Sequence, residues 1–546
     1  MTWIRRLSAR TRGTVQTLGA KAHGLVTLHR LGLRVPAGFV VTTDACRAFL
    51  REGRLPPGLD DELAAAVTGL EASTGRRFGG PRAPLAVSVR SGASVSMPGM
   101  MDTILNLGLT SGATAGLAAE TGDRLFALHA RLRFLSGFAS AITNPDAAGG
   151  GALLDGAPGQ GDGDEARVTE AIGAVHDLVR QRCGRTIPDD AARQLELAVE
   201  TVFSSWDTPR ARTYRELHDV PHDLGTAVIV QEMVFGNRDR HSGTGVAFSR
   251  DPNTGRNAPF GEVLFGHQGE DVVSGRALTR PLHELADREP AVWSGLLDAL
   301  DRVEGHYRDA CYVEFTFQSG ELWMLQVRPG RFVGGAAVRV ATDLADETVI
   351  GRREALLRVS PQHLRHVRTP RMATTGEVDI LARGLGACPG VASGRVATTA
   401  DRAVRMAADG PVVLVRPETS PHDMRGLAAA TGIVTARGGP ASHAAVVARA
   451  LGKPAVVGIA GLTVDIAEAT VTVGGRTVGE GALVTIDGTG GEVALGRLRA
   501  VTTTADAHLH RLLAWADEVS GDHSERDEAR RLGDAHAVLR RDRFDL

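Results

Sequence analysis

Several features are scarce in this sequence, and each scarcity excludes a class of protein. No apolar run approaches the roughly 20 residues that a membrane-spanning helix requires. The four cysteines are far apart and too few for a disulfide framework in a chain of 546 residues. Basic and acidic residues nearly balance, at 62 and 64, so the chain as a whole does not attract nucleic acid or an anionic membrane. We therefore expect a cytoplasmic protein that binds neither.

Lysine is the scarcest charged residue. Of the 62 basic residues only two are lysines, Lys21 and Lys453. A compact ammonium group in contact with phosphate is poorly replaced by a planar guanidinium, so Lys21 is a candidate phosphate ligand, with chance retention as the alternative. The first 43 residues contain seven basic residues and no acidic one. Because this stretch has no apolar signal core, we interpret it as a folded, phosphate-facing start and keep a targeting segment as the alternative.

The length and the pattern of the chain predict a multidomain protein of mixed α/β and α+β class. Residues 1–333 alternate helical segments and short strands. A charged helical stretch over 334–382 has no strand signals, which suits a linker. Residues 383–500 are rich in Gly, Ala and Val, with short parallel-type strands and intervening helices, and predict a compact α/β domain. Residues 501–546 are expected to be mostly helical, with a strand-like end.

Residues 312–328 are typical of a β-hairpin, because two alternating strands flank a Ser-Gly turn. Side chains two positions apart on a strand point the same way. Tyr312 and Glu314 should therefore share a face of the first strand, and Gln326 and Arg328 a face of the second.

The sharpest local signal lies at 432–458. A buried strand runs into Gly438 and Gly439, and an Ala- and Val-rich helix begins at His443. In the first turn of a helix the free N–H groups and the positive dipole end disfavour imidazolium and keep a nitrogen lone pair available as a nucleophile. This arrangement suits a phosphohistidine; a capping or packing role is the alternative.

Several long motifs resemble those of the pyruvate phosphate dikinase family. The block TARGGPASHAAVVARALGKPAVVG is similar to the phosphohistidine motif of enzymes that use phosphoenolpyruvate. Related phosphoenolpyruvate synthases share that block but not the Met-Pro-Gly-Met-Met-Asp-Thr loop. Four further motifs resemble the dikinase specifically: SVRSGASVSMPGMMDTILNLGL, FSSWDTPRARTYRELHDVP, QEMVFGNRDRHSGTGVAFSRDPNTG and GEDVVSG. The resemblance runs from about residue 21 to residue 496.

The resemblance implies an ATP-grasp nucleotide-binding domain over 1–333 and a swivelling phosphohistidine domain over 383–500. In the family, ATP gives its β-phosphoryl group to the histidine and its γ-phosphoryl group to inorganic phosphate, which releases AMP and pyrophosphate. It further implies Glu314 as a Mg²⁺ ligand and His443 as the phosphoryl carrier. The positions that match the family's ATP and Mg²⁺ site are Lys21, Arg90, Gly99, Met101, Asp102, Thr103, Asp271, Glu314, Gln326 and Arg328.

The sequence departs from the family pattern in three places. Tyr312 stands where the family has an aspartate two residues before the Glu314 position, and Ala441 stands where plant members have a regulatory threonine. The sequence also stops where a phosphoenolpyruvate- and pyruvate-binding barrel would begin. We therefore expect a short form without that barrel, in which residues 501–546 are a vestige of its start.

Three functions are compatible with this pattern. The chain phosphorylates His443 from ATP and passes the group to an acceptor site on another chain, or it is an ATP-dependent phosphotransferase with a different final acceptor, or it is a non-catalytic nucleotide-binding or regulatory relative. We favour the first two, because His443 and most of the phosphate ligands are present. A carrier that serves two distant sites must move, so we expect the histidine domain to swing on segments around 334–382 and 497–510.

Overall fold

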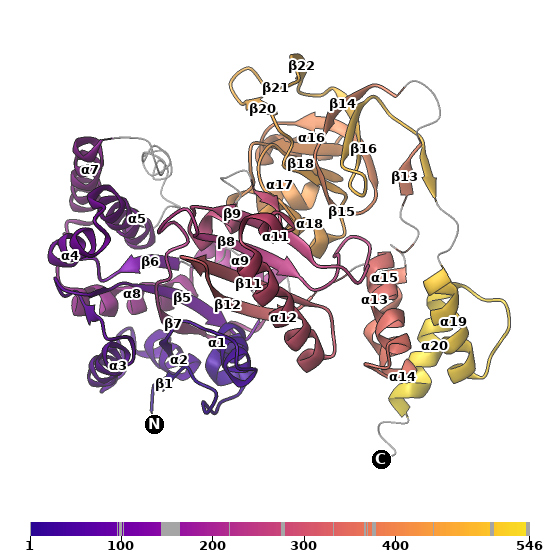
Figure 1. Cartoon of the computed structure of the whole chain (residues 1–546). Coiled ribbons are helices and arrows are strands. Elements are labelled where there is room, and N and C mark those ends of the chain that lie inside the picture. The colour runs from indigo at the N-terminus through magenta and orange to yellow at the C-terminus, as the bar shows by residue number, and fades with distance from the viewer. Residues whose placement is uncertain are drawn as a thin grey trace. The chain divides into compact units, whose positions relative to one another are not determined.

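A computed structural model describes most of the chain, in two compact units (Figure 1). The first unit contains Met1–Val234 and Trp323–Gln326, and the second contains Phe235–Leu322 and Val327–Leu546. Gly99 and Asp102 of the predicted nucleotide site, and Ala441 beside the histidine, lie outside the described residues. The described residues are 2–95, 97, 101, 103–143, 164–217, 219–274, 279–330, 332, 334–364, 367, 370–373, 378–440, 442–502 and 507–541.

The first unit is built on a five-stranded antiparallel sheet of order β1-β2-β7-β5-β6. Its strands are β1 (Ile4–Arg6), β2 (Gly38–Val41), β5 (Val87–Ala93), β6 (Thr103–Leu107) and β7 (Thr226–Glu232). Two further short strands are β3 (Arg77–Phe78) and β4 (Pro84–Leu85). The helices are α1 (Val15–Arg30), α2 (Thr43–Glu52), α3 (Leu59–Thr74), α4 (Ser111–Thr121), α5 (Arg124–Thr143), α7 (Glu165–Cys183), α8 (Ala191–Ser205) and α9 (Pro209–Leu217), followed by the short η1 (His222–Leu224).

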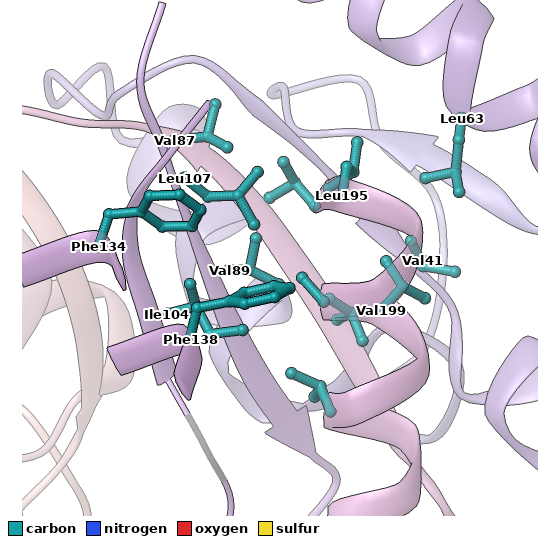
Figure 2. Close-up of a cluster of buried hydrophobic side chains, with 14 of the residues drawn as sticks. Val41, Leu63, Val87, Val89, Ile104, Leu107, Phe134, Phe138, Leu195 and Val199 are labelled. Atoms are coloured by element: carbon teal, nitrogen blue, oxygen red, sulfur yellow. The ribbon is translucent and has the colours of Figure 1, made fainter. Parts of the chain in front are cut away.

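One face of this sheet carries the hydrophobic core of the unit (Figure 2). Val87 and Val89 of β5 pack there with aromatic and aliphatic side chains of α5 and α8, among them Phe134, Phe138 and Val199. Because strand side chains alternate between the two faces, the valines of β5 direct its even-numbered residues away from this core. Arg90 therefore leaves the strand on the opposite face.

A further five-stranded sheet has the order β10-β9-β8-β11-β12. It includes the predicted hairpin, whose strands are joined at Ser319 and Gly320, both with positive φ angles, of 51° and 79°. Two residues with positive φ suit the tight turn of a hairpin, so this prediction is confirmed. The elements are β8 (Gly243–Phe248), β9 (Phe260–Phe265), β10 (Arg280–Pro281), β11 (Cys311–Gln318), β12 (Glu321–Pro329), α10 (Gly269–Ser274), α11 (Glu284–Arg288) and α12 (Pro290–Tyr307).

A mixed eight-stranded sheet follows later in the second unit, in the order β14-β24-β23-β16-β17-β18-β19-β15. Strands β16 to β19 are parallel to one another, as the sequence predicts for this region. The strands are β14 (Ile380–Arg383), β15 (Leu385–Cys388), β16 (Val391–Ala397), β17 (Val412–Arg416), β18 (Gly432–Thr435), β19 (Ala455–Val457), β23 (Leu483–Asp487) and β24 (Glu492–Leu495). Helices α16 (Ala400–Ala407), α17 (Met424–Ala429) and α18 (His443–Leu451) connect them, and a small sheet contains β20 (Thr463–Asp465), β21 (Thr470–Val473) and β22 (Arg476–Gly479).

Helices from the predicted linker and from the predicted tail pack together around one hydrophobic core (Figure 1). They are α13 (Gly334–Asp346), α14 (Arg352–Arg358), α15 (Pro361–Leu364), α19 (Ala507–Ser520) and α20 (Glu528–Arg541). Leu532, Ala535 and Leu539 are buried at helical spacing, so the expectation of a strand-like end is wrong for the described part of this segment. The chain segments that flank the eight-stranded sheet also pair, through β13 (Pro370–Met372) and β25 (Ala500–Thr502).

Within the described part of the chain, no helix combines the length and the apolar character needed to cross a membrane.

Candidate nucleotide and phosphohistidine sites

Three of the predicted nucleotide ligands gather around strand β5 of the first unit. Arg90 lies on this strand, and Thr103 is its direct partner on β6. Lys21 lies in α1, the helix that packs against β5. Residues that are 13 to 82 positions apart in the chain are therefore brought to one side of one sheet, because β5 lies beside both β6 and α1.

Two glycines allow α1 to approach the strand closely enough to place Lys21 there. Gly19 has a φ angle of 75°, and a Cβ atom at this position would lie 1.6 Å from the carbonyl oxygen of Gly92. A Cβ atom on Gly92 would lie 3.6 Å from the Cβ atom of Lys21. Gly92 and Arg90 point to the same face of β5, being two residues apart. The half-buried Lys21 thus begins over the face from which the Arg90 side chain extends.

The guanidinium group of Arg90 is held by neighbours of its own unit. Its Nη2 atom donates to Oε1 of Gln231 at 2.6 Å and to the carbonyl oxygen of Leu325 at 3.2 Å. Gln231 is itself fixed, because its Nε2 atom donates to the carbonyl oxygen of Pro36 at 2.9 Å. The contact with Leu325 also brings the predicted ligand Gln326 into this region. Gln231 was not selected from the sequence. It lies opposite Ser88 in the pairing of β5 with β7, so an alignment of these two strands would have pointed to it.

The second unit contains the acidic part of the predicted site. Tyr312 and Glu314 share a face of β11, and the tyrosine hydroxyl donates to Oε1 of Glu314 at 3.2 Å. The guanidinium carbon of Arg328 lies 4.4 Å from the centroid of the Tyr312 ring, a cation–π arrangement. Burial and the neighbouring Glu314 raise the pKa of Tyr312, so the phenol keeps its proton and remains a donor. Tyr312, which replaces the family's aspartate, therefore occupies one oxygen of the Glu314 carboxylate.

The remaining predicted nucleotide residues that the structure describes are Asp271 and Met101. Asp271 lies in α10, and its Oδ2 atom accepts a hydrogen bond from the backbone N–H of Gln268 at 3.0 Å. The next residue, Val272, belongs to a buried cluster with Tyr312 and Phe248. Asp271 is thus attached to the same sheet as Glu314. Met101 packs against a separate buried cluster in the first unit that contains Trp206 and Met97.

Glu314 can act as a magnesium ligand only together with other oxygen donors. Its Oε1 atom is taken by Tyr312, and its Oε2 atom has no hydrogen bond among the residues described. No cluster of three or more His, Cys, Asp or Glu side chains suited to a metal exists in the described part of the chain. Mg²⁺ is commonly bound by one or two carboxylates together with substrate phosphates, so this single open oxygen is compatible with Mg²⁺ delivered on a nucleotide.

His443 is the first residue of α18, as the sequence predicts. The helix follows β18 after a turn in which Gly438 has a φ angle of 97°, and Ser442 is the N-cap, its hydroxyl accepting from the backbone N–H of Ala445 at 3.4 Å. The imidazole Nδ1 atom lies 3.0 Å from Oγ1 of Thr419. The Nε2 atom is buried and has no hydrogen-bond partner in the described structure. One ring nitrogen is therefore held and the other is available.

The surroundings of His443 favour the neutral imidazole. Desolvation lowers its pKa to about 4, and the opposing attraction of Asp423 is the smaller effect. The Asp423 carboxylate is occupied elsewhere: its Oδ2 atom accepts from the N–H of Ser420 at 2.9 Å, and Oδ1 is 3.3 Å from Nε of Arg416. In the tautomer that carries its proton on Nδ1, with the Thr419 hydroxyl as acceptor, the neutral ring presents a lone pair at Nε2, the form that acts as a nucleophile.

Arg449 fixes the turn that precedes the histidine. This buried side chain donates from Nη1 to the carbonyl oxygen of Ala387 at 2.9 Å and from Nη2 to the carbonyl oxygen of Pro440. Its pKa is lowered to about 10, chiefly by desolvation. Sequence reasoning missed both Arg449 and Thr419. The available signals were an arginine in an otherwise apolar helix and a threonine after the parallel strand next to β18.

The other lysine, Lys453, has a structural environment. Its ammonium group donates to the carbonyl oxygens of Leu427 and Ala430, at 3.1 and 2.6 Å, and to that of Ala428. These carbonyls lie at the end of α17, where a helix leaves its last C=O groups without intrahelical partners. Three donors diverging from one atom suit this position, whereas a planar guanidinium does not.

Comparisons with known proteins match the regions of the chain that contain these residues. Residues 15–65 and 53–281 match the family model described as "Pyruvate phosphate dikinase, AMP/ATP-binding domain", and residues 408–491 match "PEP-utilising enzyme, mobile domain". Residues 1–14 lie before these matches.

Curated relatives include two plant enzymes named "Pyruvate, phosphate dikinase 2". That of Zea mays is 42% identical over 514 residues, which are 92% of this chain and 58% of that protein; that of Oryza sativa subsp. japonica is 41% identical over 511 residues, with the same coverage. "Pyruvate, phosphate dikinase 1, chloroplastic" of Arabidopsis thaliana is 39% identical over 93% of this chain and 54% of that protein. This chain thus spans a little over half the length of the relatives it matches. It belongs to the pyruvate phosphate dikinase family.

Proposed function

We propose that this chain is a phosphotransferase that phosphorylates its own His443 from ATP, with AMP and pyrophosphate as products. The observation that carries the proposal is the imidazole itself: neutral, bound at Nδ1 by Thr419, and with a buried Nε2 atom that has no partner among the described residues. A capping role does not require an unpartnered buried nitrogen, since such a group costs free energy.

The proposed transfer needs no proton to leave the attacking atom. The Nε2 lone pair attacks the β-phosphorus, a bond from Nε2 to phosphorus forms, and the bond from that phosphorus to the oxygen bridging the α-phosphate breaks to release AMP. The γ-phosphoryl group passes to inorganic phosphate to give pyrophosphate. Nδ1 keeps its proton throughout, so its bond to Thr419 persists and opposes rotation of the ring.

The cationic residues of the first unit support binding of the triphosphate. Lys21 and Arg90 begin on one side of β5, and Gln231 and the carbonyl of Leu325 limit the freedom of the Arg90 side chain. A guanidinium group held in place loses less entropy when it binds phosphate. Glu314 would hold Mg²⁺ through Oε2, with Asp271, Gln326 and Arg328 as further nucleotide contacts; the metal would neutralise developing phosphate charge.

The proposed acceptor lies on a partner chain that binds phosphoenolpyruvate or pyruvate, and the histidine domain would swing to reach it. The shared core of α13 to α15 with α19 and α20 supports hinges outside these helices, because bending inside a packed core would break its contacts. We also propose that this chain is located in the cytoplasm.

A second candidate function is favoured by one specific contact. The Tyr312 hydroxyl takes an oxygen of Glu314 that a metal would otherwise use, which is compatible with a chain that binds nucleotide and regulates a catalytic relative without transferring phosphate.

The deciding experiment uses Mg²⁺ and ATP labelled separately at the β and γ positions, with and without inorganic phosphate. The proposal requires acid-labile, alkali-stable label from the β position, located on residue 443 by mass spectrometry and absent from His443→Ala. Nucleotide binding with no label in the wild-type chain would leave the regulatory function. Label on another residue would refute the role of His443.

A further inference from the structure

A group of arginines at the start of the chain forms a pocket that the nucleotide and histidine sites do not use. Four of them, with Ser8 and Thr11, line a shallow, open pocket of about 300 Å³ at β1 and the turn after it; they are Arg5, Arg6, Arg10 and Arg12. Arg6, Arg10 and Arg12 are exposed and Arg5 is half-buried. Four arginine residues therefore contribute to the lining of one small space.

The turn that carries these arginines is fixed by hydrogen bonds. The hydroxyl of Thr11 donates to the carbonyl oxygen of Arg6 at 2.5 Å and accepts from the N–H of Ser8 at 3.1 Å. The N–H of Thr11 donates to the carbonyl oxygen of Ser8 at 3.1 Å, and that of Leu7 to the carbonyl oxygen of Gly38 at 2.9 Å. The backbone is thus tied both to itself and to β2.

A fifth arginine supports the same turn from α1. Arg30 donates from Nη2 to the carbonyl oxygen of Thr11 at 2.8 Å and from Nε to that of Ala9 at 3.2 Å. The guanidinium group of Arg30 therefore stabilises the backbone of this turn. The four arginines that line the pocket extend from a rigid segment. Donors held on a rigid backbone lose less entropy when they bind a ligand than donors on a mobile tail do.

The four arginines of the pocket, Arg5, Arg6, Arg10 and Arg12, have no ion-pair partner among the described residues. Glu62 lies beside β1, but its two carboxylate oxygens accept from the N–H groups of Trp3 and Ile4. Like charges gathered without a counter-charge repel one another, and a multivalent anion relieves that repulsion.

We propose that this arginine pocket binds a small phosphate-bearing anion, such as pyrophosphate or the polyphosphate part of a nucleotide. Guanidinium groups match the geometry of phosphate oxygens with paired hydrogen bonds, and the Ser8 and Thr11 hydroxyls add polar groups to the lining. A volume of about 300 Å³ is at the small end of ligand sites, which favours a compact ligand over a polymer. The site is separate from His443 and does not rest on the phosphotransferase proposal.

The test measures binding of inorganic pyrophosphate to the full chain at constant ionic strength, with a non-hydrolysable ATP analogue and Mg²⁺ saturating any nucleotide site. Calorimetry compares the wild type with the double variant Arg10→Gln, Arg12→Gln. The control is Arg54→Gln, Arg167→Gln, which removes the same charge from two exposed positions that do not line the pocket. Hydrogen exchange of the peptide 4–14 reports the location.

We expect the pocket variant to weaken pyrophosphate binding by at least about 10-fold, since it removes two guanidinium groups that would make charge-assisted hydrogen bonds to phosphate. The control should change it less than about twofold, and pyrophosphate should slow exchange in peptide 4–14 of the wild type only. Repeating the measurement with ATP without Mg²⁺ in place of pyrophosphate tests whether the pocket binds the polyphosphate part of a nucleotide equally well. Equal weakening in both double variants, no binding to the wild type, or protection by heparin but not by pyrophosphate would overturn the proposal.

Discussion

The histidine turn and the β11–β12 hairpin each hold a reactive polar group with one hydroxyl, with opposite consequences. Thr419 binds Nδ1 of His443 and leaves Nε2 without a partner among the described residues, so the hydroxyl orients the ring without occupying the nitrogen proposed as the nucleophile. Tyr312 binds Oε1 of Glu314 and competes with a metal for that oxygen. The comparison teaches that a hydroxyl beside a functional group assists only when it occupies the atom that the chemistry does not need.

The largest effect is expected from removing the carboxylate of the hairpin. Glu314→Gln keeps the shape of the side chain and an acceptor for Tyr312, but loses the negative charge that Mg²⁺ requires. We expect phosphorylation of His443 at a fixed Mg²⁺ concentration to slow by about 100-fold, the scale of losing one group that stabilises transition-state charge. Rapid-quench measurement with labelled ATP checks this. An unchanged rate would place the metal elsewhere.

Removing the Tyr312 hydroxyl, which frees Oε1 of Glu314, should favour Mg²⁺ binding, and by a smaller factor. Tyr312→Phe removes the hydroxyl that binds Oε1 of Glu314 and retains the ring that packs against Phe248 and Arg328. We expect the Mg²⁺ concentration at half-maximal nucleotide binding to fall by about 10-fold, the equivalent of one hydrogen bond to a charged group. Titration with Mg²⁺ at constant nucleotide measures it, and a higher Mg²⁺ requirement would show that the hydroxyl assists the site.

The corresponding change at the histidine should be smaller still. Thr419→Val removes the partner of Nδ1 with little change in side-chain shape, so the ring loses the hydrogen bond that orients it. We expect phosphorylation to slow by about fivefold, in line with about 1 kcal/mol for a neutral hydrogen bond. Thr419→Ser is the matched control and should restore most of the rate. A serine variant as slow as the valine variant would assign the effect to packing.

A separate effect concerns stability against pH. Because the pKa of His443 is lowered to about 4 in the folded chain, the unfolded chain binds a proton first as the pH falls below the usual histidine value. The contribution of His443 to the free energy of unfolding is therefore full above about pH 6.5 and is lost progressively down to about pH 4. Thermal unfolding from pH 7.5 to 4.5 should show a shallower loss for His443→Asn. Parallel curves would contradict the lowered pKa.

Local features were predictable from the sequence. The Ser-Gly turn gave the hairpin and the shared face of Tyr312 and Glu314, and the Gly-Gly turn before an apolar helix located the start of α18 at His443. These features depend on residues a few positions apart, whose backbone preferences and side-chain periodicity are readable in order. The resemblance added candidate ligands, and their binding roles remain predictions.

Contacts between distant residues were not predictable. Thr419 comes 24 residues before His443, and the two meet because the parallel strands β17 and β18 end at the same edge of the sheet. Gly19 and Gly92 meet only because α1 packs on β5. Neither pair has a sequence spacing that marks it.

The position of His443 at the start of a helix, the hairpin and the order of the motifs were thus readable from the sequence, since each arises from short-range patterns. Three contacts depend on the tertiary structure. Thr419 binds Nδ1 of His443, and Tyr312 occupies an oxygen of Glu314. Helices that precede the eight-stranded sheet in the sequence share one core with helices that follow it. The physical reason is that hydrogen bonds and packing at long sequence separation are selected by the whole fold, which must satisfy buried polar groups and fill space at once.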